Sequence, residues 1–113
     1  MVETSGMRAL YHPHTENLSL ESVLYAFSDP IRLEILRKLA LGSELSCGAL
    51  EIEMPKSTAS HHFKVLREAG VIRTRINGTQ RFMSLRYQDL EDRFPGLLQA
   101  VLSAAQRQIS SAP

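Results

Sequence analysis

Short hydroxyl groups and basic groups are concentrated in one segment near the middle of the chain. Ser57, Thr58 and Ser60 are small enough for their hydroxyls to approach phosphates and base edges closely. His61 can donate or accept a hydrogen bond at a base edge, and Lys64 supplies positive charge. On a helix, Ser57, Ser60, His61, Lys64 and Arg67 fall on the face opposite the apolar residues. Together they suit contact with a nucleic acid, although none of them is specific alone.

A second basic cluster lies in two β-rich runs that flank Asn77-Gly78. The alternating pattern predicts a β-hairpin over residues 71–86. Asn-Gly predicts a type I′ turn, because both residues tolerate the positive φ that its two central positions need. Arg75 and Arg81 flank the expected tip, a geometry that fits phosphates or a narrow minor groove. A merely solvated hairpin face is the alternative.

The histidines and the cysteine give weaker signals for metal or redox chemistry. Adjacent helical residues point about 100° apart, so His61 and His62 are not expected to ligate one ion, and His62 is expected to be structural. His12 and His14 lie in an N-terminal arm and would need a further ligand to hold a metal. Cys47 is expected to be a small core residue; the alternative is a redox sensor whose thiol pKa is lowered by a helix start.

Catalytic patterns are not recognisable in the sequence. It shows no catalytic triad, phosphate-binding loop or pair of carboxylates. We therefore expect no enzyme, no cofactor and no metal site.

Apolar periodicity predicts a mainly helical chain with one hairpin. Ser19, Asp29 and Ser46 are the expected N-caps, and Pro30 suits the first turn of a helix. The predicted elements are a helix to about residue 28, one over 30–41, a short one through residue 52, one over 56–68 after a three-residue turn, the hairpin 71–86, a short helix over 89–93 and a last helix over 95–110. This order is that of a winged helix-turn-helix, with recognition helix 56–68 and wing 71–86.

The chain has 113 residues, of which 43% are hydrophobic and 22% are charged, and this fits one compact domain. We expect an arm over residues 1–17 and a single winged helix-turn-helix domain over 18–113. A secretory signal and an apolar run long enough for a membrane span are not recognisable, and one cysteine cannot form an internal disulfide. These features predict a cytoplasmic protein without a membrane partner.

The last predicted helix carries a long apolar stripe with little chain left to cover it. A core of this size is modest, so a partner subunit is the natural cover. The alternative is that the stripe covers the protomer's own core. The residues expected at the interface of a homodimer in this helix are Leu98, Val101, Leu102, Ala105 and Ile109.

The sequence resembles the ArsR/SmtB family of bacterial winged-helix repressors. The resemblance covers about residues 19–86 and rests on three segments, SDPIRLEILRKLA, ELSCGAL and KSTASHHFKVLREAGVIRTRINGTQRFMSL. It implies a homodimer whose first and last helices form the interface, so that Leu20, Val23 and Leu24 join it. It also implies a repressor that binds palindromic operator DNA and leaves it when an effector, here an unidentified small molecule, binds.

Residue chemistry and resemblance together predict the contacts with double-stranded operator DNA. The expected residues are Lys56, Ser57, Thr58, Ser60, His61, Lys64, Arg67, Arg75, Asn77 and Arg81. Two recognition helices related by a two-fold axis would enter successive major grooves about 34 Å apart. A winged helix that serves as a protein-interaction module without DNA binding is the alternative from another class.

Metal-sensing members of the family often carry two or more thiolates in the third-helix motif, because soft metals need them. In ELSCGAL the positions of the usual ligands are Ser46 and Gly48, and Cys47 lies between them. Other members place histidine ligands on the last helix, whereas residues 87–113 contain none. The resemblance therefore does not imply a metal sensor; a metal- or redox-responsive regulator that uses the arm histidines or Cys47 is the alternative.

The net charge of +1 at first argues against a general polyanion binder. Its distribution changes this conclusion. Residues 1–55 have 4 basic and 8 acidic groups, residues 56–86 have 7 and 1, and residues 87–113 have 2 and 3, which gives −4, +6 and −1. The near-neutral total hides a basic segment in an acidic body, which favours docking through one face.

Overall fold

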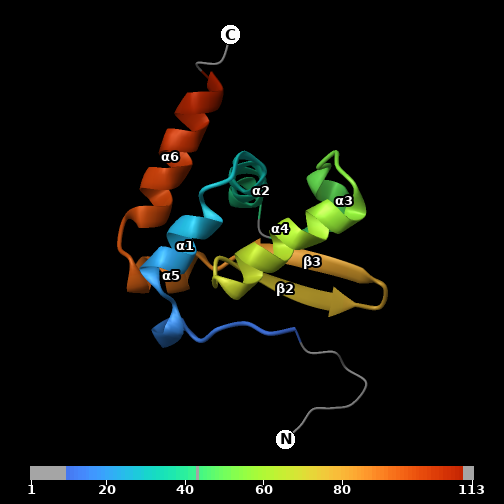
Figure 1. Ribbon diagram of the computed structural model, residues 1–113, viewed down its shortest axis with the longest axis horizontal. Helices are drawn as coiled ribbons and strands as arrows, with labels where there is room; N and C mark the ends of the chain where they lie inside the picture. The colour runs from blue at the N-terminus through green and yellow to red at the C-terminus, as the bar shows by residue number, and fades with distance from the viewer. Residues whose placement is uncertain (1–9, 43, 111–113) are drawn as a thin grey trace, which may run out of the picture.

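The computed structural model describes residues 10–42 and 44–110, with side chains up to residue 108. It is mainly helical with a small antiparallel sheet, as predicted (Figure 1). The elements in order are a 3₁₀ turn η1 (Thr15–Asn17), α1 (Leu20–Ala26), α2 (Pro30–Leu41), β1 (Leu45–Ser46), α3 (Cys47–Leu50), α4 (Lys56–Glu68), β2 (Ile72–Asn77), β3 (Gln80–Leu85), α5 (Tyr87–Arg93) and α6 (Leu97–Ser110). Among these helices, none combines the length and the apolar character that crossing a membrane requires.

Side chains cap the first turns of α1, α2 and α3. The side-chain oxygens of Ser19, Asp29 and Ser46 accept hydrogen bonds from backbone N–H groups two or three residues on, at 3.3, 2.8 and 3.1 Å. Pro30 occupies the first turn of α2, where its missing N–H is not needed. The predicted N-caps are confirmed.

The connection between α3 and α4 is longer than predicted. α3 ends at Leu50, because Glu51 adopts the left-handed conformation with φ 53°. Residues 51–55 therefore form the turn, and the expectation that the short helix reaches Ile52 is wrong. Pro55 is extended and precedes α4, which covers the predicted range.

Gly70 ends the recognition-helix segment and lets the arm approach it. Its φ is 85°, a conformation that residues with a side chain rarely adopt. A Cβ at this position would also overlap Leu18 Cδ2. Leu18 is buried here, so the glycine permits a close contact between the arm and the end of α4.

The sheet has the order β1-β3-β2, so β2 is an edge strand. In the hairpin, Asn77 pairs with Gln80, which leaves Gly78 and Thr79 as the two turn residues. Gly78 has φ 66°, and Asn77 is not among the residues with positive φ. A positive φ at the first turn residue alone is the pattern of a type II′ turn, so the predicted type I′ turn is wrong. The turn therefore lies one position further along the chain, and the register of the hairpin shifts by two residues, so that Ile76 pairs with Arg81 and not with Thr79.

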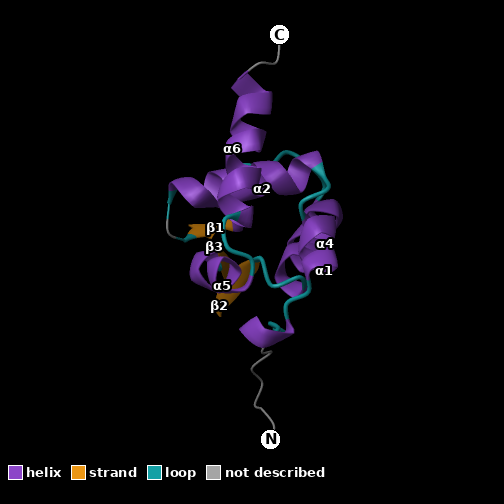
Figure 2. Ribbon diagram, turned by 90° about the vertical axis from the view of Figure 1, so that its left-hand side faces the viewer, coloured by secondary structure: helices purple, strands orange, loops and turns teal. Residues whose placement is uncertain are grey.

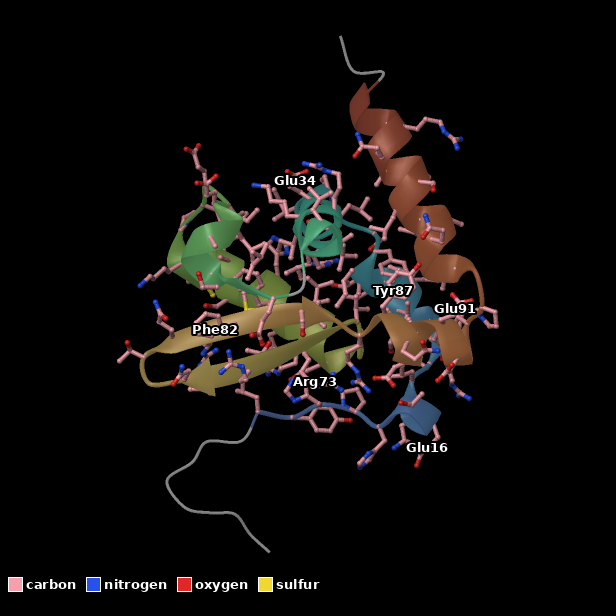
Figure 3. The ribbon with its side chains drawn as sticks, turned by 180° about the vertical axis from the view of Figure 1, so that it is seen from behind. Glu16, Glu34, Arg73, Phe82, Tyr87 and Glu91 are labelled. Atoms are coloured by element: carbon pink, nitrogen blue, oxygen red, sulfur yellow. The ribbon has the colours of Figure 1, made fainter. Side chains whose placement is uncertain are left out.

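The core lies where the helices pack against one face of the sheet (Figure 2). α4 covers this face of the hairpin, and the other face is uncovered when the molecule is seen from behind (Figure 3). The largest fully buried side chains are Leu18, Ile35, Leu36, Leu39, Leu50, Leu66, Ile72, Met83, Leu90, Val23 and Val71.

Three residues expected at a subunit interface belong to the interior of the protomer instead. Val23, Leu98 and Ala105 are 0%, 2% and 6% exposed. Their helical faces point inward, because apolar periodicity alone does not tell a stripe that covers the protomer's own core from one that faces a partner. The side chain of Ile109 lies outside the described residues.

Candidate nucleic-acid interface

One face of α4 is exposed and carries the hydroxyl and basic groups found in the sequence. Its exposed residues are Lys56, Ser57, Thr58, Ser60, His61, Lys64 and Glu68. The inward face packs through Leu66, which is fully buried, and through Phe63, which is half-buried. The first turn has no acidic residue. The helix therefore presents short hydroxyls and an imidazole between two lysines.

Arg67 is not part of this exposed face. It is buried, and its Nε donates to the carbonyl oxygen of Tyr11 at 3.1 Å. Its guanidinium also lies 3.9 Å from the Glu68 carboxylate. The prediction that Arg67 lies on the exposed face and contacts DNA is wrong. Its side chain bonds to the N-terminal arm, and the sequence did not indicate the path of this arm.

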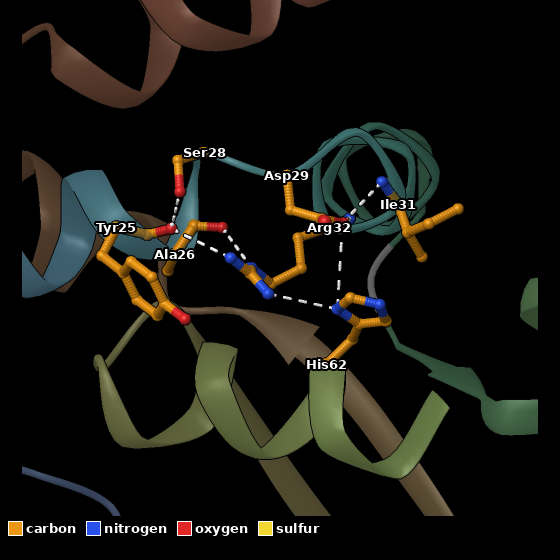
Figure 4. Close-up of polar contacts among 7 residues, drawn as sticks. All are labelled: Tyr25, Ala26, Ser28, Asp29, Ile31, Arg32 and His62. Atoms are coloured by element: carbon orange, nitrogen blue, oxygen red, sulfur yellow. Dashed lines mark hydrogen bonds and ion pairs between the residues drawn. The ribbon is translucent and has the colours of Figure 1, made fainter. Parts of the chain in front are cut away.

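His62 is structural, as predicted, and belongs to a buried polar cluster (Figure 4). Arg32 of α2 donates from Nη1 to His62 Nδ1 at 3.2 Å. Its Nε and Nη2 donate to the carbonyls of Ala26 and Tyr25 at 2.9 and 3.1 Å. Asp29, which caps α2, lies 3.8 Å from His62 Nδ1. One guanidinium thus joins the end of α1 to α4.

The tautomer of His62 follows from this contact. A guanidinium only donates, so Nδ1 accepts, and the ring proton of the neutral imidazole is on Nε2. The cluster fixes the orientation of α4 from its buried side, while His61 on the next position is exposed. The two adjacent histidines therefore have different roles, as their 100° separation predicts.

Arg75 and Arg81 lie on opposite faces of the wing. Arg81 is paired with Ile76 and shares the helix-facing side of the hairpin, whereas Arg75 is opposite Phe82 on the uncovered side. Arg75 donates to both Glu44 carboxylate oxygens, at 3.1 and 2.9 Å, and its guanidinium lies 4.8 Å from the centre of the Phe82 ring. The hydrogen bonds from Arg75 hold the pKa of Glu44 below its usual value. The two arginines expected to act together at the tip are thus separated by the strand alternation.

The basic residues of segment 56–86 divide into paired and unpaired groups. Ion pairs or carboxylate contacts join Arg67 to Glu68, Arg73 to Asp89, Arg75 to Glu44 and Arg86 to Asp89. Within the described residues, the cations without such a partner are Lys56, Lys64 and Arg81. Lys56 and Arg81 both lie within electrostatic range of the Cys47 thiol. The unpaired positive charge therefore follows α4 and the helix-facing side of the wing.

Cys47 does not have the lowered thiol pKa expected of a redox sensor, and the ring nitrogens of His12 are not free to bind a metal. Cys47 is exposed, so the core position predicted for it is wrong. Partial burial of its thiol raises its pKa, and Arg81 and Lys56 only oppose this shift, contrary to the lowering expected from a helix start. Both ring nitrogens of His12 are engaged, by Leu10 O and by the N–H of Thr74. In residues 10–42 and 44–110 there is no group of three potential metal ligands.

Sequence reasoning missed Arg32 and Glu44. Arg32 had a detectable signal, because it is spaced at i, i+3, i+4 and i+7 with Ile35, Leu36 and Leu39, all buried, and thus lies on the apolar face of α2. A basic residue on such a face predicts a buried partner. Glu44 precedes a two-residue strand, and its contact with the wing depends on tertiary pairing that no local pattern encodes.

Comparison with known proteins places the chain in a family. A sequence profile described as a helix-turn-helix domain matches residues 27–75. The HTH-type transcriptional regulator YceK of Bacillus subtilis is 42% identical over 82 residues, which cover 70% of this chain and 82% of YceK. The arsenical resistance operon repressor of Staphylococcus xylosus is 37% identical over 73 residues, 64% of this chain and 70% of that protein.

Solved structures show the same fold. The transcriptional repressor BigR from Xylella fastidiosa has a TM-score of 0.60 at 32% identity, over 83% of this chain and 88% of that one. An ArsR family transcriptional regulator has a TM-score of 0.60 at 23% identity, over 82% and 98%. With the exposed α4 face and the hairpin beside it, these findings agree with the resemblance seen in the sequence. The chain belongs to the ArsR/SmtB family of winged helix-turn-helix transcriptional regulators.

Proposed function

We propose that this regulator is a homodimeric, sequence-specific DNA-binding repressor that leaves a palindromic operator when an effector binds. It acts by binding and not by catalysis. The observation that carries the proposal is the set of three exposed cations, Lys56, Lys64 and Arg81, which have no carboxylate partner in the described part of the chain. Cations already neutralised within the protein would gain less from phosphates, so the unpaired ones mark the docking face.

The side chains on this face fall into two groups, those that contact phosphates and those that contact bases. Lys56, Lys64 and Arg81 contact phosphates and set the register of α4 on the duplex. Ser60 and His61 lie between the lysines and reach base edges in the major groove, where hydroxyl and imidazole groups can read donors and acceptors. Arg75 is a weaker contact, because Glu44 already occupies its guanidinium.

Exposed apolar side chains on α1 support the dimer. Leu20 and Leu24 are each 46% exposed and Tyr25 is 59% exposed, in a helix of seven residues. α6 extends away from the body in both views (Figures 1 and 2), and its Val101 and Leu102 are half-buried. These groups would be buried against a second copy, and binding to a palindromic operator requires the two α4 helices of such a dimer to lie about one helical turn of DNA apart, about 34 Å.

The proposed effector acts by binding more tightly to the dimer arrangement that does not fit the operator than to the one that does. A ligand with equal affinity for both arrangements would not shift the equilibrium between them. Soft metals such as arsenic need two or more thiolates, and the 113 residues hold one cysteine. The arsenical repressor of Staphylococcus xylosus is therefore a guide to the fold and to repression but not to the effector of this chain.

DNA fragments recovered from the source genome with the purified protein give the operator for the main test. Binding is then measured by fluorescence anisotropy at several salt concentrations. Lys64→Ala and Arg81→Ala should each flatten the slope of log K against log salt by about 1.8 for the dimer, because each protomer loses one phosphate contact, worth about 0.9. Arg75→Ala is the matched control on the same hairpin and should change the slope less.

Specificity is tested by the double variant Ser60→Ala/His61→Ala. It should reduce the preference for the operator over a scrambled duplex, because base contacts carry sequence information and phosphate contacts do not. An unchanged preference would show that these two residues do not read the bases. Salt-insensitive binding to a protein and none to DNA would favour the interaction-module alternative.

The dimer is tested by light scattering of Leu24→Glu. A carboxylate in an apolar interface should give monomers with weakened operator binding. Leu41→Glu is the control, because Leu41 is 81% exposed on another helix. A Leu24→Glu protein that is still dimeric would exclude this surface as the interface.

A further inference from the structure

Residues 10–18, which we call the strap, run along the outer edge of β2 (Figure 1). Pro13 and Leu18 of the strap are buried. Three strap carbonyls accept hydrogen bonds from arginines of the body: Tyr11 from Arg67 at 3.1 Å, Pro13 from Arg86 at 2.7 Å and Leu18 from Arg93 at 2.9 Å. These arginines come from α4, from the segment after β3 and from α5. The strap therefore connects the end of the recognition helix with the segment that follows the wing and with α5.

His12 supplies the contact between the strap and the middle of β2. Its Nε2 accepts from the backbone N–H of Thr74 at 2.9 Å, and its Nδ1 lies 3.1 Å from the carbonyl oxygen of Leu10. A carbonyl only accepts, so Nδ1 carries the proton and Nε2 is the unprotonated nitrogen. This is the neutral imidazole, and it satisfies an N–H that the edge strand would otherwise leave unpaired.

We infer that His12 is a positioning residue that joins the strap to the wing in its neutral form only, so that protonation releases the edge of β2. A protonated ring has donors on both nitrogens and cannot accept from Thr74. The change is local and reversible, and it acts on the strand that carries the wing. The contact is a switch between a clamped and an unclamped wing.

The charges around His12 favour the neutral form. The cations that face it are Arg67 of α4, Arg73 of β2 and Arg86 after β3. Two carboxylates lie in the same region, but both pair with arginines: Glu68 contacts Arg67, and Asp89 of α5 contacts Arg73 and Arg86. Burial first, and the three arginines with it, lower the pKa of His12 below 6.5, although the contact with Leu10 opposes this.

The direction of the pH dependence follows. The unfolded or released imidazole titrates near 6.5 and the docked one below this value. The contribution of His12 to the stability of the docked strap is therefore complete above about pH 7. It is lost as the pH falls through 6.5 toward the lower pKa of the docked imidazole. Asp89 has a lowered pKa, from its bonds to Arg86 and Thr15, and stays ionised through this range.

Release of the strap should weaken DNA binding, a consequence that rests on the proposed function. The wing carries Arg81. α4 packs directly on one face of the hairpin, and the strap adds a second connection, between the edge of β2 at Thr74 and the end of α4 at Arg67. An unclamped wing would have to be ordered on binding, which costs affinity. The clamp itself exists without DNA and can be measured separately.

The experiment compares wild type with two substitutions of His12 in the full chain. His12→Gln keeps an amide oxygen near the position of Nε2 and does not titrate, whereas His12→Leu has no acceptor. His14→Gln is the matched control, because His14 is the exposed neighbour in the same strap. Amide exchange of Thr74, corrected for the intrinsic rate, is followed by NMR at about pH 8 and about pH 5.5, on either side of the pKa of free histidine.

In wild type and His14→Gln, exchange at Thr74 should accelerate about fivefold at the lower pH, the factor of one net hydrogen bond. His12→Gln should keep slow exchange at both values, and His12→Leu should be fast at both. Equal pH dependence in wild type and His12→Gln would overturn the proposal. So would slow exchange in a folded His12→Leu protein, since it would show that the imidazole does not hold the strand.

Operator affinity at the same two pH values separates this inference from the proposed function. The ratio of the Kd of wild type to that of His12→Gln should rise at the lower pH. Any effect of the exposed His61 on the Kd is the same in both proteins and does not change this ratio. A clamp that responds to pH with an unchanged Kd ratio would refute the link to DNA binding. Absence of any operator binding at both pH values would refute the proposed function and leave the exchange result standing.

Discussion

Replacing Arg32 by methionine should destabilise the protein far more than an ordinary surface substitution. Arg32 is 4% exposed and donates to two backbone carbonyls and to His62. The carbonyl of Ala26 depends on it, because the residue four positions on is Pro30, which has no N–H to continue the helix pattern. The carbonyl of Tyr25 keeps its bonds from Ser28.

The magnitude follows from the groups that lose their donor. In the Arg32→Met variant, the Ala26 carbonyl and His62 Nδ1 become buried acceptors without partners, and each costs about 1–3 kcal/mol. Methionine fills most of the volume of the arginine side chain. Removal of the buried charge also avoids its desolvation cost, which offsets part of the destabilisation. The expected decrease in the free energy of unfolding is about 3 kcal/mol, or a Tm lower by roughly 10–15 °C for a chain of this length.

The assay is denaturant and thermal unfolding at one fixed protein concentration, because a dimer's stability depends on concentration. Arg37→Met is the control on the same helix. Arg37 is only partly buried and pairs with Glu34 at 2.8 Å, and such a surface pair contributes about 0.2–1 kcal/mol. Equal unfolding midpoints for the two variants would refute the conclusion that the Arg32 guanidinium holds α1 against α4.

Three further predictions concern single positions. Gly70→Ala should lower Tm more than Gly96→Ala, because both have positive φ but a Cβ overlaps Leu18 only at residue 70; equal Tm values would contradict the close contact. Thr74→Val should leave the Tm unchanged or raise it slightly, because the Thr74 hydroxyl is buried and has no hydrogen-bond partner among the residues that the structure describes. A clear fall in Tm would show a hidden hydrogen bond. Cys47 should react with iodoacetamide more slowly at neutral pH than a free cysteine, because its pKa is raised. A faster reaction would favour the alternative of a redox sensor with a lowered thiol pKa.

The winged helix-turn-helix order could be predicted because its signals are local. Asp29 and Pro30 mark the start of α2, and helical periodicity defines the length of α4. The turn of the hairpin was placed one residue early, because Asn-Gly fits a type I′ turn but Gly78 can also stand first in a type II′ turn. The ladder pair between Asn77 and Gln80 decides between them, and the sequence does not reveal this pair.

The candidate site was predictable in the part that depends on helical periodicity and not in the part that depends on long-range contacts. His61 and His62 were separated correctly by their angle around α4. The burial of Arg67 was missed because its acceptor, Tyr11, lies 56 positions earlier in the chain. The engagement of Arg75 was missed for the same reason, since Glu44 is 31 positions away.

NMR mapping of the operator-bound protein tests the central claim most directly. Amide shifts of the full chain are recorded while an operator duplex is added, with a scrambled duplex for comparison. We expect the largest operator-specific changes at Ser57, Ser60, His61 and Lys64 and at Arg81 on the wing. Changes centred on Glu34, Glu51 and Glu53, which line a pocket beside α2 and the turn after α3, or no difference between the two duplexes, would contradict this expectation.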